Sequence, residues 1–289
     1  MTEILITGGA GNLGRSLAFA LKDRDVGLRL LDLPSCDFSF CEDWPNARGI
    51  PADILQPDSL REALEGVDLV YHLAAILPPA SERNRELTFR VNVEGTRNLV
   101  DACSSCGRIS SLIFASSVSV YGNTSHETEL IKPDHPVNPF DWYAESKVEA
   151  EQILMTSGLP CVNLRISGIV IPAFLDPPEP WAFMPDQRIE LLALGDLIRA
   201  LANLEGLAEA GGQNLLLAGG SSWQVTGQQY VNRWGEIMEI PLEEMSFMDQ
   251  PGWLNWYDTT KSQTLLNYQQ TSLDAFYGEL NLAVQEALA

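Results

Sequence analysis

The chain has 289 residues, of which 45% are hydrophobic and 20% charged, the composition of an ordinary globular protein. Its formal net charge of −21 argues against binding to nucleic acid or to an anionic membrane surface, because both need a basic patch. No stretch reaches the roughly 18 apolar residues that span a bilayer, and no basic leader precedes the first apolar run. We therefore expect a cytoplasmic protein.

The five cysteines are too few, and odd in number, for a disulfide framework in a chain of this length. Cys103 and Cys106 have the spacing of a metal or redox pair. No second pair follows, and only three histidines occur, so we expect no metal site and place these cysteines near the end of a helix.

Short apolar runs alternate with stretches of helical spacing in the first half of the chain. The expected strands are Glu3–Thr7, Leu28–Asp32, Asp68–Ala75, Ser111–Ser116 and Cys161–Ile166. The expected helices are Leu13–Leu21, Pro57–Gly66, Phe89–Ser104 and Trp142–Met155, with a loop over Pro34–Arg48. Continuous apolar strands between helices predict a parallel sheet covered on both faces, in a doubly wound α/β fold.

The second half breaks this rhythm. Pro172–Pro185 holds five prolines together with Trp181 and Phe183, which predicts an irregular loop near a pocket. Beyond it we expect a strand and two helices, at Asn214–Ala218, Val225–Ile237 and Ser272–Leu288. The aromatic residues Trp181, Phe183, Trp223 and Trp253–Tyr257 fit a substrate pocket or the core of a smaller cap domain, and both readings stay open.

A glycine-rich turn between the first strand and the first helix predicts a dinucleotide site. Gly8 allows the tight bend, Gly11 lets the backbone approach a pyrophosphate, and Gly14 lets the helix pack closely on the strand. The helix then begins with free N–H groups directed at the anion. Asp32 ends the second strand, where a carboxylate accepts hydrogen bonds from ribose hydroxyls and repels a 2′-phosphate. NAD is therefore expected, and Arg15 keeps NADP as the less favoured alternative.

Tyr143 and Lys147 stand four residues apart on an expected helix, so their side chains share one face. An ammonium near a phenol favours the phenolate, which allows Tyr143 to exchange a proton near neutral pH. A serine-rich segment, Ser116–Gly122, ends the strand before this helix, and a hydroxyl there can bind a substrate oxygen. A turn that is merely rich in serine is the competing interpretation of each serine.

Together these residues resemble the extended short-chain dehydrogenase/reductases, the NAD-dependent epimerase/dehydratase group. The matching pieces, in order, are Thr7–Gly14, Asp32, Ala52–Ile54, His72–Ala75, Asn92–Thr96, Ser117–Gly122, Tyr143–Lys147 and Leu164–Arg165. The resemblance covers about the first 165 residues and is looser beyond, at Asp196 and at Asp258–Lys261. It implies a cofactor-binding Rossmann domain over 1–165, with parts of 190–222 as a candidate completion, and a substrate-binding cap over 166–289.

The resemblance also implies roles for individual residues. Tyr143 would be the acid/base, Lys147 its partner and a ribose ligand, Ser117 the substrate-binding hydroxyl, and Asn92 a residue that holds the active-site architecture. The implied cofactor-binding residues are Gly8, Gly11, Asn12, Leu13, Gly14, Asp32, Asp53, Ile54, Leu73, Ala74, Ala75, Tyr143 and Lys147. The small-molecule substrate is unnamed, and a homodimer, through the helices expected at Phe89–Ser104 and Trp142–Met155, is left open.

Departures from the family pattern narrow the expected chemistry. The run Ser117-Val118-Ser119 lacks the acid pair with which sugar-nucleotide dehydratases eliminate water. Arg165 and Arg188 lie in segments that differ from the nucleotide-sugar epimerase pattern. We therefore expect an NAD-dependent dehydrogenase acting on a sugar-like or other hydroxylated small molecule. A nucleotide-sugar epimerase that retains NAD, and a redox sensor without catalysis, are the alternatives.

Overall fold

The computed structural model describes residues 1–205 and 212–289, which form two compact units. The first unit comprises Met1–Val120, Pro139–Leu164 and Leu201–Asn214, and the second comprises Tyr121–Asn138, Arg165–Ala200 and Leu215–Ala289. The chain thus passes between the units several times. None of the helices in the described part of the chain is long and apolar enough to cross a bilayer.

A parallel sheet with helices on both faces, of which strands β1 to β5 lie wholly in the first unit, confirms the expected fold class. The sheet order is β10-β6-β5-β4-β1-β2-β3, and the pairs β1–β2, β1–β4, β2–β3 and β4–β5 are parallel. The strands are β1 (Thr2–Thr7), β2 (Val26–Asp32), β3 (Ala47–Pro51), β4 (Leu69–His72), β5 (Ser111–Ser117), β6 (Cys161–Ile166) and β10 (Gln213–Leu217).

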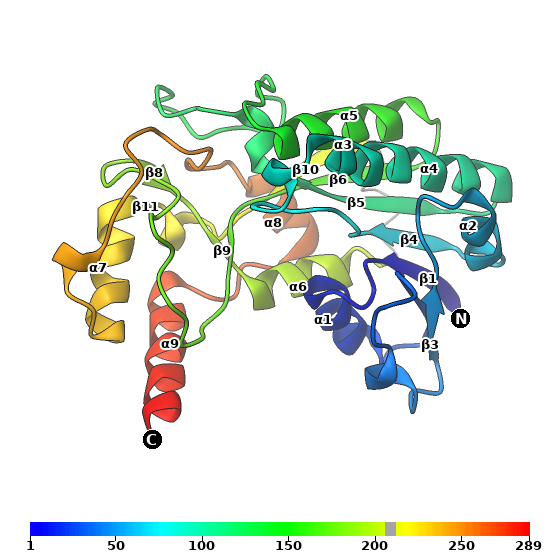
Figure 1. Ribbon diagram of the computed structural model, residues 1–289, viewed down its shortest axis with the longest axis horizontal. Helices are drawn as coiled ribbons and strands as arrows, with labels where there is room; N and C mark the ends of the chain where they lie inside the picture. The colour runs from blue at the N-terminus through cyan, green and yellow to red at the C-terminus, as the bar shows by residue number, and fades with distance from the viewer. Residues whose placement is uncertain (206–211) are drawn as a thin grey trace. The chain divides into compact units, whose positions relative to one another are not determined.

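Buried side chains from alternate strand positions join the sheet to its helices. Leu5, Leu31 and Val70 pack in one core with helices α2 (Pro57–Leu64), α4 (Gly95–Cys106) and α5 (Trp142–Thr156). In Figure 1, α1 (Asn12–Leu21) lies on the other side of the sheet from these three helices. A short helix α3 (Arg85–Phe89) and a π-helical turn (Arg90–Glu94) run directly into α4.

The second unit holds a separate core, rich in aromatic residues. Its helices are α7 (Gly227–Met238), α8 (Thr260–Leu266) and α9 (Leu273–Leu288), and α6 (Leu194–Asn203) begins in it. Its short strands are β7 (Ile169–Val170), β8 (Arg188–Ile189), β9 (Leu192–Ala193) and β11 (Val225–Thr226). Trp181, Phe183 and Trp223 are buried in its core with residues of α7 and α9. For these three aromatic residues, the structure favours core packing over a pocket lining.

Most expected elements lie within a few residues of the observed ones, but the sequence does not predict all of them, and the short strands β7, β8, β9 and β11 are among those missed. Strand β3 begins inside the segment expected to be a loop, because its five residues are only partly buried and include a glycine and a proline. This composition is typical of an edge strand, and β3 does end the sheet. Helices α6 and α8 were also not anticipated. The segment from Pro172 to Pro185 is irregular apart from one isolated bridge at Trp181, as expected.

Candidate active site

The glycine turn lies at the carboxyl end of β1, where two of its glycines fill space that no larger residue could occupy. Gly8 has a φ of +71°, and a Cβ there would approach the Ala74 backbone nitrogen to 2.9 Å. A Cβ on Gly14 would lie 2.2 Å from the Gly8 carbonyl oxygen, whereas one on Gly11 would meet only that oxygen, at 3.2 Å. The turn is therefore tight on its inner side and open at Gly11, as close approach of a pyrophosphate requires.

Helix α1 begins directly at this turn, with Gly11 as its N-cap and no side chain capping its N–H groups. Its first turn carries no acidic residue, and Gly11 and Asn12 are exposed. Uncapped N–H groups at a helix N-terminus favour an anion. The residues present thus fit the phosphates of a dinucleotide.

Asp32 ends the neighbouring strand β2, beside the turn. Its carboxylate accepts hydrogen bonds from the Ala10 N–H, at 3.1 Å, and from the Leu33 N–H, at 2.9 Å. Arg15, the residue that kept NADP open, donates to the carbonyls of Ala10 and Asp37 and lies 4.5 Å from the centre of the Phe40 ring. Because this guanidinium already has protein partners, the geometry favours a cofactor without a 2′-phosphate.

The remaining predicted cofactor residues follow the ends of β3 and β4. Ile54 is buried, and the Asp53 carboxylate accepts from the Leu55 N–H at 2.9 Å. Leu73, Ala74 and Ala75 follow β4, and their segment packs against Gly8. Since carboxyl ends of parallel strands meet at one edge of a sheet, these residues share that edge with the glycine turn and Asp32.

Ser117 ends β5 at the same edge, and Tyr143 and Lys147 project from the first turns of α5. Tyr143 is half-buried and hydrogen-bonded to Ser117, whereas Lys147 is fully buried. The Lys147 Nζ donates to the Ala115 carbonyl at 2.8 Å and lies 5.6 Å from the centre of the Tyr143 ring. The structure therefore brings together the three residues that the sequence nominated for proton transfer.

Burial is the largest influence on the pKa values of Tyr143 and Lys147. It raises the pKa of Tyr143 above its usual range, with the nearby Asp141 adding to the rise and the hydrogen bond to Ser117 opposing it. Burial also lowers the pKa of Lys147 to about 7, against the opposing effect of Glu151. Both groups thus favour their neutral forms more strongly than in water.

Asn92 joins the segment after β4 to helix α5. Its Oδ1 accepts from the Ile76 N–H at 2.8 Å, and its Nδ2 donates to the Ile76 carbonyl at 3.1 Å and to Ser146 Oγ at 3.0 Å. Ser146 Oγ in turn donates to the Tyr143 carbonyl at 2.7 Å. Asn92 therefore acts on the position of Tyr143 through the backbone.

A buried chain of hydrogen bonds through His72 was not anticipated. The Ala74 N–H donates to Thr7 Oγ1, which lies 2.7 Å from His72 Nδ1, while Thr96 Oγ1 lies 2.8 Å from Nε2 and donates to the Asn92 carbonyl. Because the Thr96 hydroxyl proton is already used, Nε2 must carry the ring proton and Nδ1 must accept from Thr7. The chain links the strand before the glycine turn to Asn92. No spacing in the sequence marks it, since the threonines lie on β1 and α4.

Two carboxylates occupy the N-terminus of α5. The Asp141 side chain accepts from the Ala144 N–H at 2.7 Å. Glu82, which precedes α3, accepts from the N–H groups of Trp142 and Tyr143 at 3.1 and 3.0 Å. Asp141 precedes the helix as a recognisable N-cap, but Glu82 is 60 residues away, and the sequence offered no signal for it.

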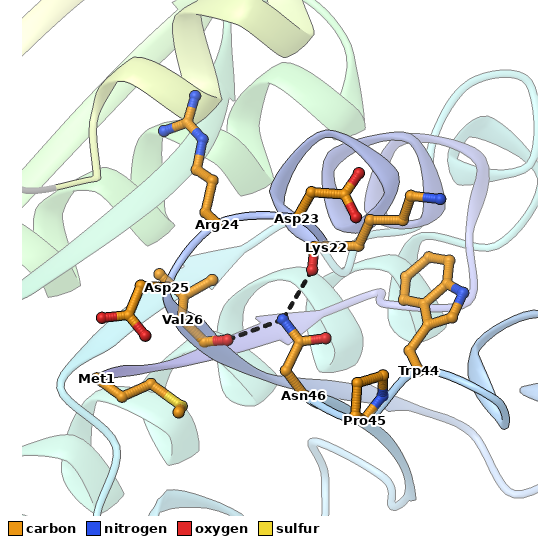
Figure 2. Close-up of a pocket in the computed structure, with 9 residues that line it drawn as sticks. All are labelled: Met1, Lys22, Asp23, Arg24, Asp25, Val26, Trp44, Pro45 and Asn46. Carbon is orange, nitrogen blue, oxygen red and sulfur yellow. Dashed lines mark hydrogen bonds between the residues drawn. The ribbon is translucent and has the colours of Figure 1, made fainter.

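A surface hollow of about 330 Å³ in the first unit is a separate feature (Figure 2). It is lined by Met1, Lys22–Val26 and Trp44–Asn46, and the Asn46 side chain donates to the carbonyls of Lys22 and Val26. Met1 and Val26 lie at the amino ends of β1 and β2. The hollow is thus at the edge of the sheet opposite the glycine turn and is not part of the candidate site.

Comparison with known sequences identifies relatives that match between half and two thirds of the chain. Human sterol-4-alpha-carboxylate 3-dehydrogenase, decarboxylating, is 30% identical over 176 residues, which are 61% of this chain and 45% of that protein. D-erythronate dehydrogenase of Cupriavidus necator is 32% identical over 161 residues, 53% of this chain and 49% of that protein. The chain therefore spans about half the length of the curated relatives it matches.

Solved structures match the whole fold at lower identity. UDP-glucuronic acid 4-epimerase from Bacillus cereus, in complex with UDP-glucuronic acid and NAD, has a TM-score of 0.83 at 24% identity and covers 99% of this chain and 100% of that one. A short-chain dehydrogenase/reductase superfamily protein from Agrobacterium tumefaciens with bound NAD has a TM-score of 0.82 at 22% identity, covering 99% and 98%. At such identities the likeness shows the fold alone.

A family model described as the NAD dependent epimerase/dehydratase family matches residues 4–178. This match covers the glycine turn, Asp32, Ser117, Tyr143 and Lys147. At the level of the family, the expected enzyme class and the expected cofactor, NAD, are confirmed. The chain belongs to the NAD dependent epimerase/dehydratase family.

Proposed function

We propose that the chain is an NAD-dependent oxidoreductase that transfers a hydride between a sugar-like or other hydroxylated small molecule and NAD. The observation that carries this proposal is the meeting of Ser117, Tyr143 and Lys147 in the unit that also holds the glycine turn and Asp32. A phenol, a hydroxyl and an ammonium at one point serve the proton half of alcohol oxidation.

NAD, when bound, supplies the hydride acceptor or donor. The uncapped start of α1 and the open side of Gly11 would hold its pyrophosphate, and Asp32 would accept from the ribose hydroxyls. Lys147 would reach a second ribose with the N–H groups that Ala115 does not use.

Tyr143 moves the proton in this proposal. During oxidation its phenolate oxygen, which accepts a hydrogen bond from Ser117 Oγ, takes the proton of the substrate hydroxyl. Once Tyr143 is protonated, the Ser117 hydroxyl is free to donate to the substrate oxygen instead. Burial opposes the phenolate, so the charge on Lys147 and the hydrogen bond from Ser117 must favour it. During reduction Tyr143 returns the proton to the carbonyl oxygen.

The contacts of two arginines support a dehydrogenase over a nucleotide-sugar epimerase. Arg165 donates to the Tyr121 hydroxyl at 3.0 Å and to the Pro133 carbonyl at 2.9 Å. Arg188 donates to the Thr128 carbonyl at 2.8 Å and lies over the ring of Trp256. Both side chains are held by protein groups of the second unit, which leaves them poorly placed to bind a diphosphate. The two curated relatives described above are also named as dehydrogenases.

The test is NADH formation with a panel of substrates that includes free sugars, aldonates and 3-hydroxysteroids. We expect turnover on at least one class, and a loss of at least about 100-fold in Tyr143→Phe with NAD binding retained. Tyr71→Phe is the matched control, because its buried hydroxyl donates to the Leu201 carbonyl and has no role in the chemistry.

Three outcomes would contradict the proposal. Tyr143→Phe with wild-type turnover would remove the assigned acid/base. NAD that copurifies with the protein, together with epimerisation of a nucleotide sugar and no net reduction, would favour the epimerase. No turnover on any panel, with NAD still bound, would favour the sensor. A cytoplasmic location and a homodimer stay predictions.

A further inference from the structure

Glu151 is a buried carboxylate in the site that the proposed chemistry does not use. It lies on α5, four residues after Lys147 and eight after Tyr143, so the three side chains follow one face of the helix. Glu151 is 6% exposed, and its Oε1 accepts a short hydrogen bond from Ser116 Oγ, on β5. A buried carboxylate fixed by a second element needs a physical reason.

The surroundings of Lys147 suggest that reason. Lys147 is 2% exposed, and its ammonium donates to the Ala115 carbonyl and lies 4.7 Å from the centre of the Phe114 ring. Such a group is costly to bury in charged form without an anion nearby.

Three titratable side chains act on Lys147 or lie against it, namely Tyr143, His72 and Glu151. Burial lowers the pKa of His72 to about 3 and raises that of Tyr143, so both are neutral at neutral pH. In the described part of the chain, Glu151 is thus the anion that opposes the loss of the Lys147 proton.

We propose that Glu151, anchored by Ser116, is a positioning residue of the active site whose carboxylate keeps the Lys147 ammonium charged beside Tyr143. The inference rests on the proposed function only where it says that the charge on Lys147 serves proton transfer by Tyr143. The electrostatic link itself concerns Lys147 and Glu151 alone, and it is measurable without substrate or cofactor.

The chain contains only four lysines, Lys22, Lys132, Lys147 and Lys261, which makes a direct measurement practical. With ¹³Cε-labelled lysine, NMR follows the titration of each side chain separately, and Lys147→Met identifies the Lys147 signal. We expect Glu151→Gln to lower the Lys147 titration midpoint by about one pH unit or more, because the amide keeps an acceptor for Ser116 but removes the charge.

Glu149→Gln is the matched control, since Glu149 is exposed on the same helix two residues away. The Lys147 midpoint in this variant should equal that of the wild type. Equal Lys147 midpoints in Glu151→Gln and Glu149→Gln would overturn the proposal. Ser116→Ala keeps the carboxylate but removes its anchor, and we expect a downward shift smaller than that of Glu151→Gln.

Should Glu151→Gln fail to fold, Ser116→Ala decides alone. A lowered midpoint then supports the proposal, and an unchanged midpoint overturns it. Because the protein is titrated without cofactor or substrate, a chain that oxidises no alcohol leaves this outcome intact. Conversely, if the Lys147 midpoint does not change in Glu151→Gln, the inference is overturned even when turnover depends on Tyr143.

Discussion

Asp32 and Arg15 show how single side chains define the adenosine end of the site. Asp32 is oriented by two backbone N–H groups, so its carboxylate is fixed before any ligand arrives. Arg15 is held by two carbonyls and by the face of Phe40, and Asp37 lies 3.9 Å from its guanidinium. A preorganised acceptor lowers the entropic cost of binding a ribose, and an arginine with partners offers little to a phosphate.

Asp32→Ser should therefore weaken NAD binding by about tenfold, which corresponds to about 1.4 kcal/mol, and should reduce the preference for NAD over NADP. The loss arises because a serine hydroxyl cannot accept from two ribose hydroxyls as a carboxylate does. Calorimetric titration with both cofactors measures it. Asp25→Ser, at the opposite edge of the sheet, should leave both affinities unchanged. Equal losses in the two variants would refute the assigned role of Asp32.

The glycine turn and α1 work as one element, because the helix can begin only where the turn lets it. A Cβ on Gly14 would collide with the Gly8 carbonyl and would also lie 2.8 Å from Gly9 Cα, both of them backbone atoms that cannot rotate away. Any larger residue at Gly14 must push α1 away from β1. The open start of the helix would move with it.

Gly14→Ala should destabilise the chain by about 1–3 kcal/mol and weaken NAD binding, since the turn must shift to admit the methyl group. Gly278→Ala makes the same change inside α9, where a Cβ would meet nothing within 4 Å. That control should instead gain about 0.5–1 kcal/mol from the better helix propensity of alanine. Urea unfolding measures both variants, and destabilisation of similar size in each would contradict the steric argument.

Across the whole molecule, the site residues that the sequence could predict are those marked by local patterns, whereas residues joined by long-range contacts could not be predicted. The glycine turn with Asp32, and Tyr143 with Lys147, are marked by spacing within or between neighbouring elements, so the sequence alone could nominate them. The hydrogen bonds that α5 donates to Glu82 span 60 and 61 residues, and the one that Ser116 donates to Glu151 spans 35. The partners of His72 lie 65 and 24 residues away, on different elements. Such contacts form only through tertiary packing, and no periodicity in the sequence predicts them.

The burial of His72 should appear in the acid stability of the protein. Its pKa is lowered to about 3, whereas in the unfolded chain it lies near about 6.5. Between these values the unfolded state binds a proton that the folded state excludes, so the free energy of unfolding falls as the pH drops through this window. Between about pH 6.5 and about pH 4.5, the free energy of unfolding of His72→Gln should therefore fall by about 2 kcal/mol less than that of the wild type.

Urea unfolding at the two pH values measures this change for each protein. The hydrogen bonds that the variant lacks are missing at both pH values, so their contribution cancels when the two free energies of unfolding are subtracted. His126→Gln is the control for the substitution itself, because the His126 side chain is 72% exposed. An identical loss in His72→Gln and the wild type would mean that His72 titrates in the folded state as it does in water.

The two helix N-termini of the site differ in the charge that they favour. Helix α1 starts without a side-chain cap, whereas Asp141 and Glu82 already accept the first three N–H groups of α5. A phosphate is therefore favoured at the start of α1 and disfavoured at the start of α5, where it would face two carboxylates. Of these two helix starts, the fold thus leaves only α1 to the charged part of a dinucleotide and keeps the start of α5 for uncharged or cationic groups.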